Sequence, residues 1–184
     1  MKYWPVPNSY SKEIPTAVSP GSFWENRDDR RHCGVDIYAP AGSKVVSIDD
    51  GVVVKIDIFT SLKEVSYWNE TKYVLIKNND GFYCKYAELR DVVVNENEFV
   101  KAGQVIGHVS MVLNIDKITE NSPEYIQKIK NNKKPSMLHF ELFISKPDYQ
   151  KFYSGGNWFD SKIPEDLLDP TDYLKSTYKK RKRV

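Results

Sequence analysis

Short runs of alternating apolar and polar residues, separated by turns, fill the middle of the chain. Such alternation predicts β-strands, because successive side chains of a strand point to opposite faces of a sheet. The expected strands cover residues 44–48, 52–58, 72–77, 82–89 and 105–109. Asp-Gly lies in two of the gaps between them, at Gly51 and Gly81, as suits tight hairpins. The pattern predicts a mainly β protein with an antiparallel barrel or sandwich-like core.

Two short helices are expected outside this β pattern. Ser122-Pro123-Glu124 combines a cap residue, a proline and an acid at the start of a helix, which favours helix initiation. It lies in an insertion, residues 111–136, that directly precedes the last strong strand pattern. We expect the insertion to form one wall of a cleft, or to be a neutral surface elaboration. A second helix is expected from Asp169-Pro170 to Tyr178.

The chain length is typical of one domain. A domain of 184 residues buries roughly 70% of the surface of its unfolded chain. We therefore expect a single domain over residues 1–178, followed by a basic tail at 179–184. Prolines in the first thirty residues exclude a helix there, which predicts an extended N-terminal wrap. Two cysteines are too few for a disulfide scaffold.

Charge and hydropathy exclude some classes of partner. The formal net charge of +2 is too small to indicate nucleic acid binding. No apolar run approaches the ~18 residues of a membrane span, and the first residues lack the apolar core of a signal peptide. We therefore expect neither membrane insertion nor export directed by this chain, which leaves its localisation open. The basic tail is expected to be solvated, with contact to an anionic polymer as the alternative.

Three residues are candidates for a metal site. His32 and Asp36 lie four apart, with Gly34 between them, and His139 lies in an alternating run far downstream. Imidazole nitrogen and carboxylate oxygen bind zinc at about 2.0–2.2 Å. Three protein ligands with an open fourth position are typical of catalytic zinc. The pattern therefore predicts a zinc ion held by these three side chains.

Several segments together resemble the lysostaphin/LytM-type zinc metallopeptidases. They read RRHCGVDIYAPAGSKV, DDGVVVKI, KYAELRDVVVNENEFVKAGQVIGHVS, LHFEL and LDPTDYL. The resemblance implies the β-sheet core of that family, related to the duplicated hybrid motif, and one Zn²⁺ per chain. It also implies hydrolysis of peptide bonds in the stem or cross-bridge peptides of bacterial peptidoglycan.

The chain departs from that family at two positions. The resembled peptidases carry two further histidines for proton transfer, where this chain has Glu88 and Met137. A thioether cannot transfer a proton, so Met137 is expected to line the substrate pocket. A carboxylate beside zinc can act as a general base, the role we expect for Glu88. Strand alternation places Tyr86 on the same face as Glu88, where it could donate a hydrogen bond to an oxyanion.

Two alternatives remain open. The first is a catalytically silent, zinc-binding member of the same fold that binds cell wall or regulates a hydrolase, with Cys33 as a candidate fourth ligand. The second is a biotinyl- or lipoyl-carrier-like module, whose hairpins resemble FVKAGQVIGHV. A carrier needs a lysine at a hairpin tip, but the turn at Asp49-Asp50-Gly51 has none. The carrier would also leave the three candidate ligands without a role.

Overall fold

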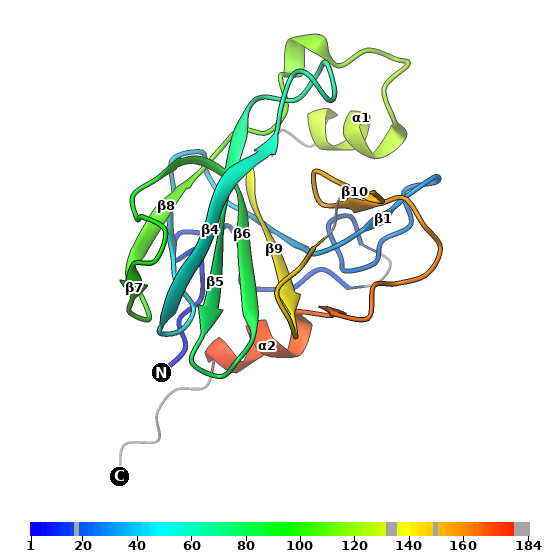
Figure 1. The fold of residues 1–184 in the computed structure, drawn as a ribbon. Helices are drawn as coiled ribbons and strands as arrows, with labels where there is room; N and C mark the ends of the chain where they lie inside the picture. Colours follow the sequence, from blue (N-terminus) through cyan, green and yellow to red (C-terminus); the bar gives the residue numbers. More distant parts are fainter. Residues whose placement is uncertain (17–18, 132–135, 149–150, 179–184) are drawn as a thin grey trace.

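The computed structural model describes residues 1–16, 19–131, 136–148 and 151–178 (Figure 1). Most of the strands join one nine-stranded sheet, in which β12, β9, β6, β5, β4 and β7 are neighbours in that order. In addition, β2 pairs with β9, and β8 pairs with both β3 and β6. The strands of this main sheet are β2 (Val35–Tyr38), β3 (Lys44–Val46), β4 (Gly51–Thr60), β5 (Thr71–Asn78), β6 (Tyr83–Val92), β7 (Phe99–Val100), β8 (Val105–Val109), β9 (Met137–Phe143) and β12 (Leu167–Leu168).

A second, three-stranded sheet has the order β1-β11-β10 and lies beside β9 in Figure 1. Its strands are β1 (Arg31–His32), β10 (Tyr153–Ser154) and β11 (Asn157–Trp158). The helical segments are α1 (Glu124–Asn131), α2 (Thr171–Lys175) and the 3-10 turns η1 (Ile115–Lys117) and η2 (Ser176–Tyr178). Every strand pairing is antiparallel. The mainly β prediction and both helices are confirmed, although the described strands form no closed barrel.

The central strand β9 separates two regions of the interior. Leu138, Phe140 and Leu142 alternate along β9 and belong to the main hydrophobic core. The intervening side chains, among them His139 and Glu141, point to the opposite face, because side chains alternate along a strand. All seven residues of β9 are buried, so this second face is covered as well. The polar residues of β9 therefore lie inside the molecule.

A β-bulge interrupts β6 opposite Tyr73 of β5. Val74 pairs with Tyr86 and Lys72 pairs with Leu89, so two residues of β6, Ala87 and Glu88, face one residue of β5. Glu88 has φ 63°, a left-handed conformation that is unusual for a residue with a side chain. The bulge shifts the alternation of side chains, and the prediction that Tyr86 and Glu88 share a face is wrong.

The N-terminal wrap and the two helices lie at the edges of the main sheet. The wrap hydrogen-bonds the core through Tyr3 N to Ile48 O at 2.9 Å and Val46 N to Pro5 O at 2.9 Å. In Figure 1, α1 lies near the start of β9, and α2 lies at its opposite end. The basic tail falls outside the described residues. Among the described residues, no helix is long and apolar enough to cross a membrane.

Candidate metal centre

His32, Asp36 and His139 meet at one point between the two sheets. Asp36 of β2 lies directly opposite His139 of β9 in the strand register, and β1 brings His32 beside them. His32 Nε2 lies 3.1 Å from Asp36 Oδ1 and 2.9 Å from His139 Nδ1. His139 Nδ1 lies 3.0 Å from Asp36 Oδ1. A side chain at Gly34 would come within 2.4 Å of the Phe140 carbonyl oxygen, so glycine permits this approach.

The outer nitrogen of each histidine has a hydrogen-bond acceptor. His32 Nδ1 donates to the Ser22 carbonyl oxygen at 2.8 Å. His139 Nε2 lies 2.8 Å from Glu141 Oε1. With these protons on the outer nitrogens, His32 Nε2 and His139 Nδ1 face Asp36. The three side chains therefore present two imidazole nitrogens and one carboxylate oxygen to a common point.

Burial and neighbouring charges shift the pKa values of this group in different directions. Burial lowers the pKa of His32, and the nearby Arg27 lowers it further. Burial would also lower the pKa of His139, but its hydrogen bonds with Asp36 and Glu141 raise that pKa to about 9. Burial would raise the pKa of Asp36, but the two histidines hold it well below its usual range. Without a metal, the site therefore favours an ionised Asp36 beside a protonated His139.

Glu88 and Met137 line a small cavity together with Asp36. Its volume is about 40 Å³, little more than the ≈30 Å³ share of one water in the liquid. Glu88 is 9% exposed, and its Oε2 is buried with no hydrogen-bond partner in the described part of the chain. Burial and the neighbouring Asp36 carboxylate raise the pKa of Glu88 to about 8. The Glu88 carboxyl group thus lines the same cavity as one of the three donor residues, Asp36.

Tyr86, expected beside Glu88, lies in the main hydrophobic core instead. Its hydroxyl oxygen accepts a hydrogen bond from Ile48 N at 2.9 Å, and its ring packs edge-on against Phe140 at 5.3 Å. The bulge explains why Tyr86 and Glu88 lie on different faces. Its extra residue interrupts the alternation of side chains between Tyr86 and Glu88. Tyr86 is therefore not placed to contact a substrate bound at the cavity.

Cys33, the candidate fourth ligand, does not join the donor group. In the described residues, the group of side chains that could hold a metal consists of His32, Asp36 and His139 alone. The Cys33 side chain is fully buried in a second hydrophobic cluster with Phe143. Burial strongly raises the pKa of its thiol, whereas metal binding needs a thiolate.

The insertion covers the cavity as one of its walls. Val112, Leu113 and Ile126 line the cavity and pack with Trp68 of the β4–β5 loop in a separate hydrophobic cluster. Asn69 N donates to Val112 O at 2.7 Å, which ties the loop to the insertion. Described residues of the insertion thus line the cavity, and the influence of the insertion on substrate choice stays a prediction.

Three polar residues near the site had not been expected from the sequence. Glu141 contacts His139, and Lys85 and Tyr153 contact Glu141. The spacing of Glu141, two residues after His139 on a strand, was a usable signal, since residues i and i+2 share a face. Tyr153 belongs to the short hairpin of β10 and β11. No local pattern connects that segment with β9.

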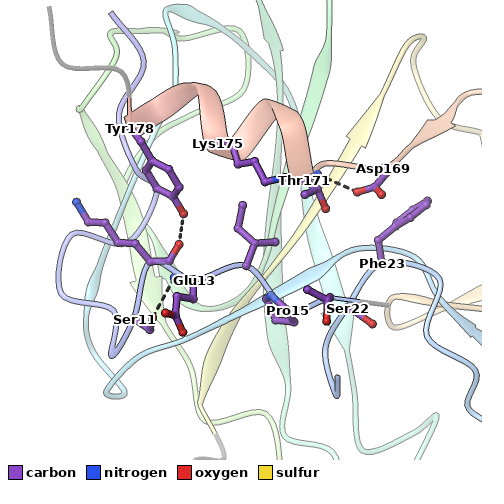
Figure 2. Close-up of a pocket in the computed structure, with 12 residues that line it drawn as sticks. Ser11, Glu13, Pro15, Ser22, Phe23, Asp169, Thr171, Lys175 and Tyr178 are labelled. Atoms are coloured by element: carbon purple, nitrogen blue, oxygen red, sulfur yellow. Dashed lines mark hydrogen bonds between the residues drawn. The ribbon is translucent and has the colours of Figure 1, made fainter. Parts of the chain in front are cut away.

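A larger cavity lies elsewhere, between the N-terminal wrap and α2 (Figure 2). Its volume is about 670 Å³. Figure 2 shows Pro15, Phe23 and Tyr178 around it. Ser22 also lines this cavity, and its carbonyl oxygen accepts a hydrogen bond from the candidate ligand His32. This cavity contains none of the three donor residues.

The fold and the buried donors together define a mainly β protein with a candidate mononuclear metal centre. Residues 30–150, more than half of the chain, match the profile of peptidase family M23. The chain therefore belongs to peptidase family M23, which confirms the resemblance seen in its sequence motifs.

Comparison with individual proteins agrees with this assignment. Over 80 residues the chain is 34% identical to the peptidoglycan DD-endopeptidase ShyC of Vibrio cholerae, a match that covers 42% of this chain and 16% of ShyC. The catalytic domain of lysostaphin from Staphylococcus simulans has a TM-score of 0.53 at 19% identity, over 89% of this chain and 92% of that domain. LytU has a TM-score of 0.52 at 18% identity, over 89% and 84%. At these identities, the structural likeness establishes a lysostaphin-type fold.

Proposed function

We propose that this chain is a zinc-dependent endopeptidase that hydrolyses stem or cross-bridge peptides of peptidoglycan. The main support is that His32 Nε2, Asp36 Oδ1 and His139 Nδ1 lie within 3.1 Å of one another. Asp36 also lines a cavity with Glu88, whose Oε2 has no hydrogen-bond partner among the described residues. Family membership supports peptidase chemistry. The substrate class is supported by the relative ShyC, which is named as a peptidoglycan DD-endopeptidase.

The donor set suits a single zinc ion. Zinc prefers imidazole and carboxylate ligands, and a site with three protein ligands leaves a position for a water or substrate oxygen. The outer nitrogens of both histidines have acceptors, as metal-binding histidines almost always do. Only one such group of donors occurs within the described ranges, which supports one zinc per chain. When bound, zinc would polarise the scissile carbonyl and activate a water.

Glu88 is proposed as the general base, although histidine performs this work in the resembled peptidases. The carboxylate would accept a proton from the attacking water and return it to the leaving amine. Its left-handed backbone conformation costs on the order of 1–3 kcal/mol, and such outliers cluster at functional sites. The bulge turns Glu88 toward the cavity that Asp36 also lines. This strained conformation at the cavity that Asp36 lines supports the assignment of Glu88 as the base.

Met137 is proposed to form an apolar wall of the substrate pocket. It is 3% exposed and lines the same cavity as Glu88 and Asp36. An apolar wall excludes water from the reacting groups, which strengthens the electrostatic interactions there. Tyr86 has no part in the proposal, because its hydroxyl is occupied by Ile48 on the other face of the sheet.

Two variants separate metal binding from proton transfer. His139→Ala removes one of the three donors and is expected to abolish tight zinc binding. Glu88→Gln keeps the size of the side chain and is expected to retain zinc while peptide hydrolysis falls by about 10²–10⁴-fold. Both are measured as zinc content and as release of new amines from purified peptidoglycan. Full activity of Glu88→Gln would overturn the assignment of the base.

A catalytically silent, zinc-binding module is the second candidate function. The observation that favours it is the burial of the donors, since His32, Asp36 and His139 are 1%, 4% and 2% exposed. Zinc binding without amine release from several types of peptidoglycan would establish this alternative.

A further inference from the structure

A buried ion pair lies directly behind His139. Lys85 of β6 and Glu141 of β9 face each other in the strand register, and Lys85 Nζ lies 3.2 Å from Glu141 Oε2. The side chains are 7% and 0% exposed. Removing two charges from water is costly, so an ion pair that is this deeply buried needs further hydrogen-bond partners. The other carboxylate oxygen of Glu141 lies 2.8 Å from His139 Nε2.

Tyr153 completes the contacts of this pair. Its hydroxyl donates to Glu141 Oε1 at 2.6 Å and accepts from Lys85 Nζ, also at 2.6 Å. The Lys85 ammonium lies 4.1 Å from the centre of the Tyr153 ring and 4.9 Å from that of Tyr73. Aromatic faces attract a cation at such distances. Phe59, whose ring centre is 5.4 Å from Lys85 Nζ, also packs against His139, with ring centres 5.4 Å apart.

The direction of these hydrogen bonds determines which nitrogen of His139 carries a proton. An ammonium group only donates hydrogen bonds, so Lys85 donates to both Tyr153 and Glu141. Tyr153 must then use its own proton toward Glu141, whose carboxylate accepts from every partner. Glu141 can therefore accept a hydrogen bond from His139 Nε2 but cannot donate one. His139 Nε2 keeps its hydrogen, so Nδ1, on the side of His32 and Asp36, is the nitrogen that would give up its proton to bind a metal.

We propose that Lys85, Glu141 and Tyr153 are positioning residues that fix the tautomer and orientation of His139 for metal binding. This inference rests on the proposed zinc site. Lys85 supplies the opposing charge that keeps a carboxylate at Glu141, and Tyr153 joins the β10–β11 hairpin to it. Gly156 of that hairpin also lies close to the imidazole, because a side chain there would come within 2.7 Å of His139 Cε1 and Nε2. The hairpin and the Glu141 carboxylate therefore both restrict the position of the ring.

The test compares zinc affinity in three variants, Glu141→Gln, Lys85→Met and Tyr153→Phe. A glutamine at position 141 must direct its amide nitrogen either at Lys85 or at His139, so one contact is lost in both orientations. Loss of such an outer partner typically weakens metal binding by about 10–100-fold. We expect this loss for Glu141→Gln and Lys85→Met, and a smaller one for Tyr153→Phe, in competition with a zinc chelator.

A matched control is available at His108, whose Nδ1 lies 2.6 Å from Asp91 Oδ1. Asp91→Asn removes the same kind of contact from a histidine outside the donor group and is expected to leave zinc affinity unchanged. A second measurement is the visible absorption of the Co²⁺-substituted protein, which reports the arrangement of ligands around the metal. We expect it to change in Glu141→Gln but not in Asp91→Asn.

The outcomes separate this proposal from the proposed function. If the wild-type protein binds zinc tightly and all three variants match it in affinity and Co²⁺ spectrum, the positioning role is wrong while the zinc site stands. If the wild-type protein binds no zinc, the proposed function and this inference both fail. Tyr153→Phe deletes a single hydroxyl, and it keeps the test decisive should either charge substitution prevent folding.

Discussion

Two buried glutamates of this protein are expected to respond to the same substitution with opposite signs. Glu88 is buried with one oxygen that has no hydrogen-bond partner among the described residues. Glu141 is buried with contacts to His139, Lys85 and Tyr153. Methionine is similar in length to glutamate and needs no hydrogen bond. Glu88→Met should therefore stabilise the zinc-free protein, and Glu141→Met should destabilise it.

The magnitudes follow from the partners each side chain has. A buried polar group without a partner costs about 1–3 kcal/mol, so its removal at Glu88 should raise the free energy of unfolding by about that amount. For a protein of this size, each 1 kcal/mol corresponds to about 2–4 °C in Tm. Glu141→Met leaves Lys85 buried without its counter-charge, which costs about 3–5 kcal/mol. Thermal unfolding of the two zinc-free variants, followed by circular dichroism, measures both changes.

The increase in stability caused by Glu88→Met should also depend on pH. The pKa of Glu88 is raised to about 8 in the folded, metal-free protein, against an ordinary value of 4.5. Between these two values the folded state holds a proton that the unfolded state has lost, so the stability of the wild-type protein falls as pH rises through this window. The advantage of Glu88→Met should therefore be smallest below pH 4.5 and largest above pH 8. A lower Tm for Glu88→Met at pH 8, or an advantage that does not grow with pH, would refute this reasoning.

Three further outcomes are expected. Ile126→Ala, which widens the 40 Å³ cavity, should raise the rate of amine release from peptidoglycan while costing about 2–5 kcal/mol in stability; a lower rate at equal zinc content would contradict the role of the insertion as a wall. Gly156→Ala should weaken zinc binding in chelator competition, because the new methyl group would press on His139; unchanged affinity would show that the hairpin does not hold the ring. The Cys33 thiol, buried and with a raised pKa, should react with a thiol reagent only after denaturation, and rapid labelling of the native protein at Cys33 would contradict its place in the second cluster.

The sequence predicted the strands and the donor residues because both depend on local patterns. Alternation predicted β4, β5, β6 and β8 to within a few residues. The chain bends at Gly34 between β1 and β2, and this bend separates His32 from Asp36. His139 was recognisable as a third candidate ligand because it lies in an alternating pattern that predicts a strand.

The sequence could not predict features that depend on strand register or on distant segments. The bulge at Glu88 adds one residue to β6 without changing the composition of the strand, so simple alternation put Tyr86 on the wrong face. The contact of Tyr153 with Glu141 depends on a hairpin whose strands have two residues each, too short for a periodic pattern. Gly155-Gly156 forms the turn of that hairpin, and Gly156 lies against His139. These features arise from tertiary packing.

The most direct test of a zinc peptidase at this site is the release of new amines from purified peptidoglycan, measured on protein of known zinc content with and without a chelator. We expect one zinc per chain, and we expect amine release to stop when the chelator removes the metal and to return when zinc is restored. Amine release that persists without zinc, or a purified protein that takes up no zinc at His32, Asp36 and His139, would contradict this expectation.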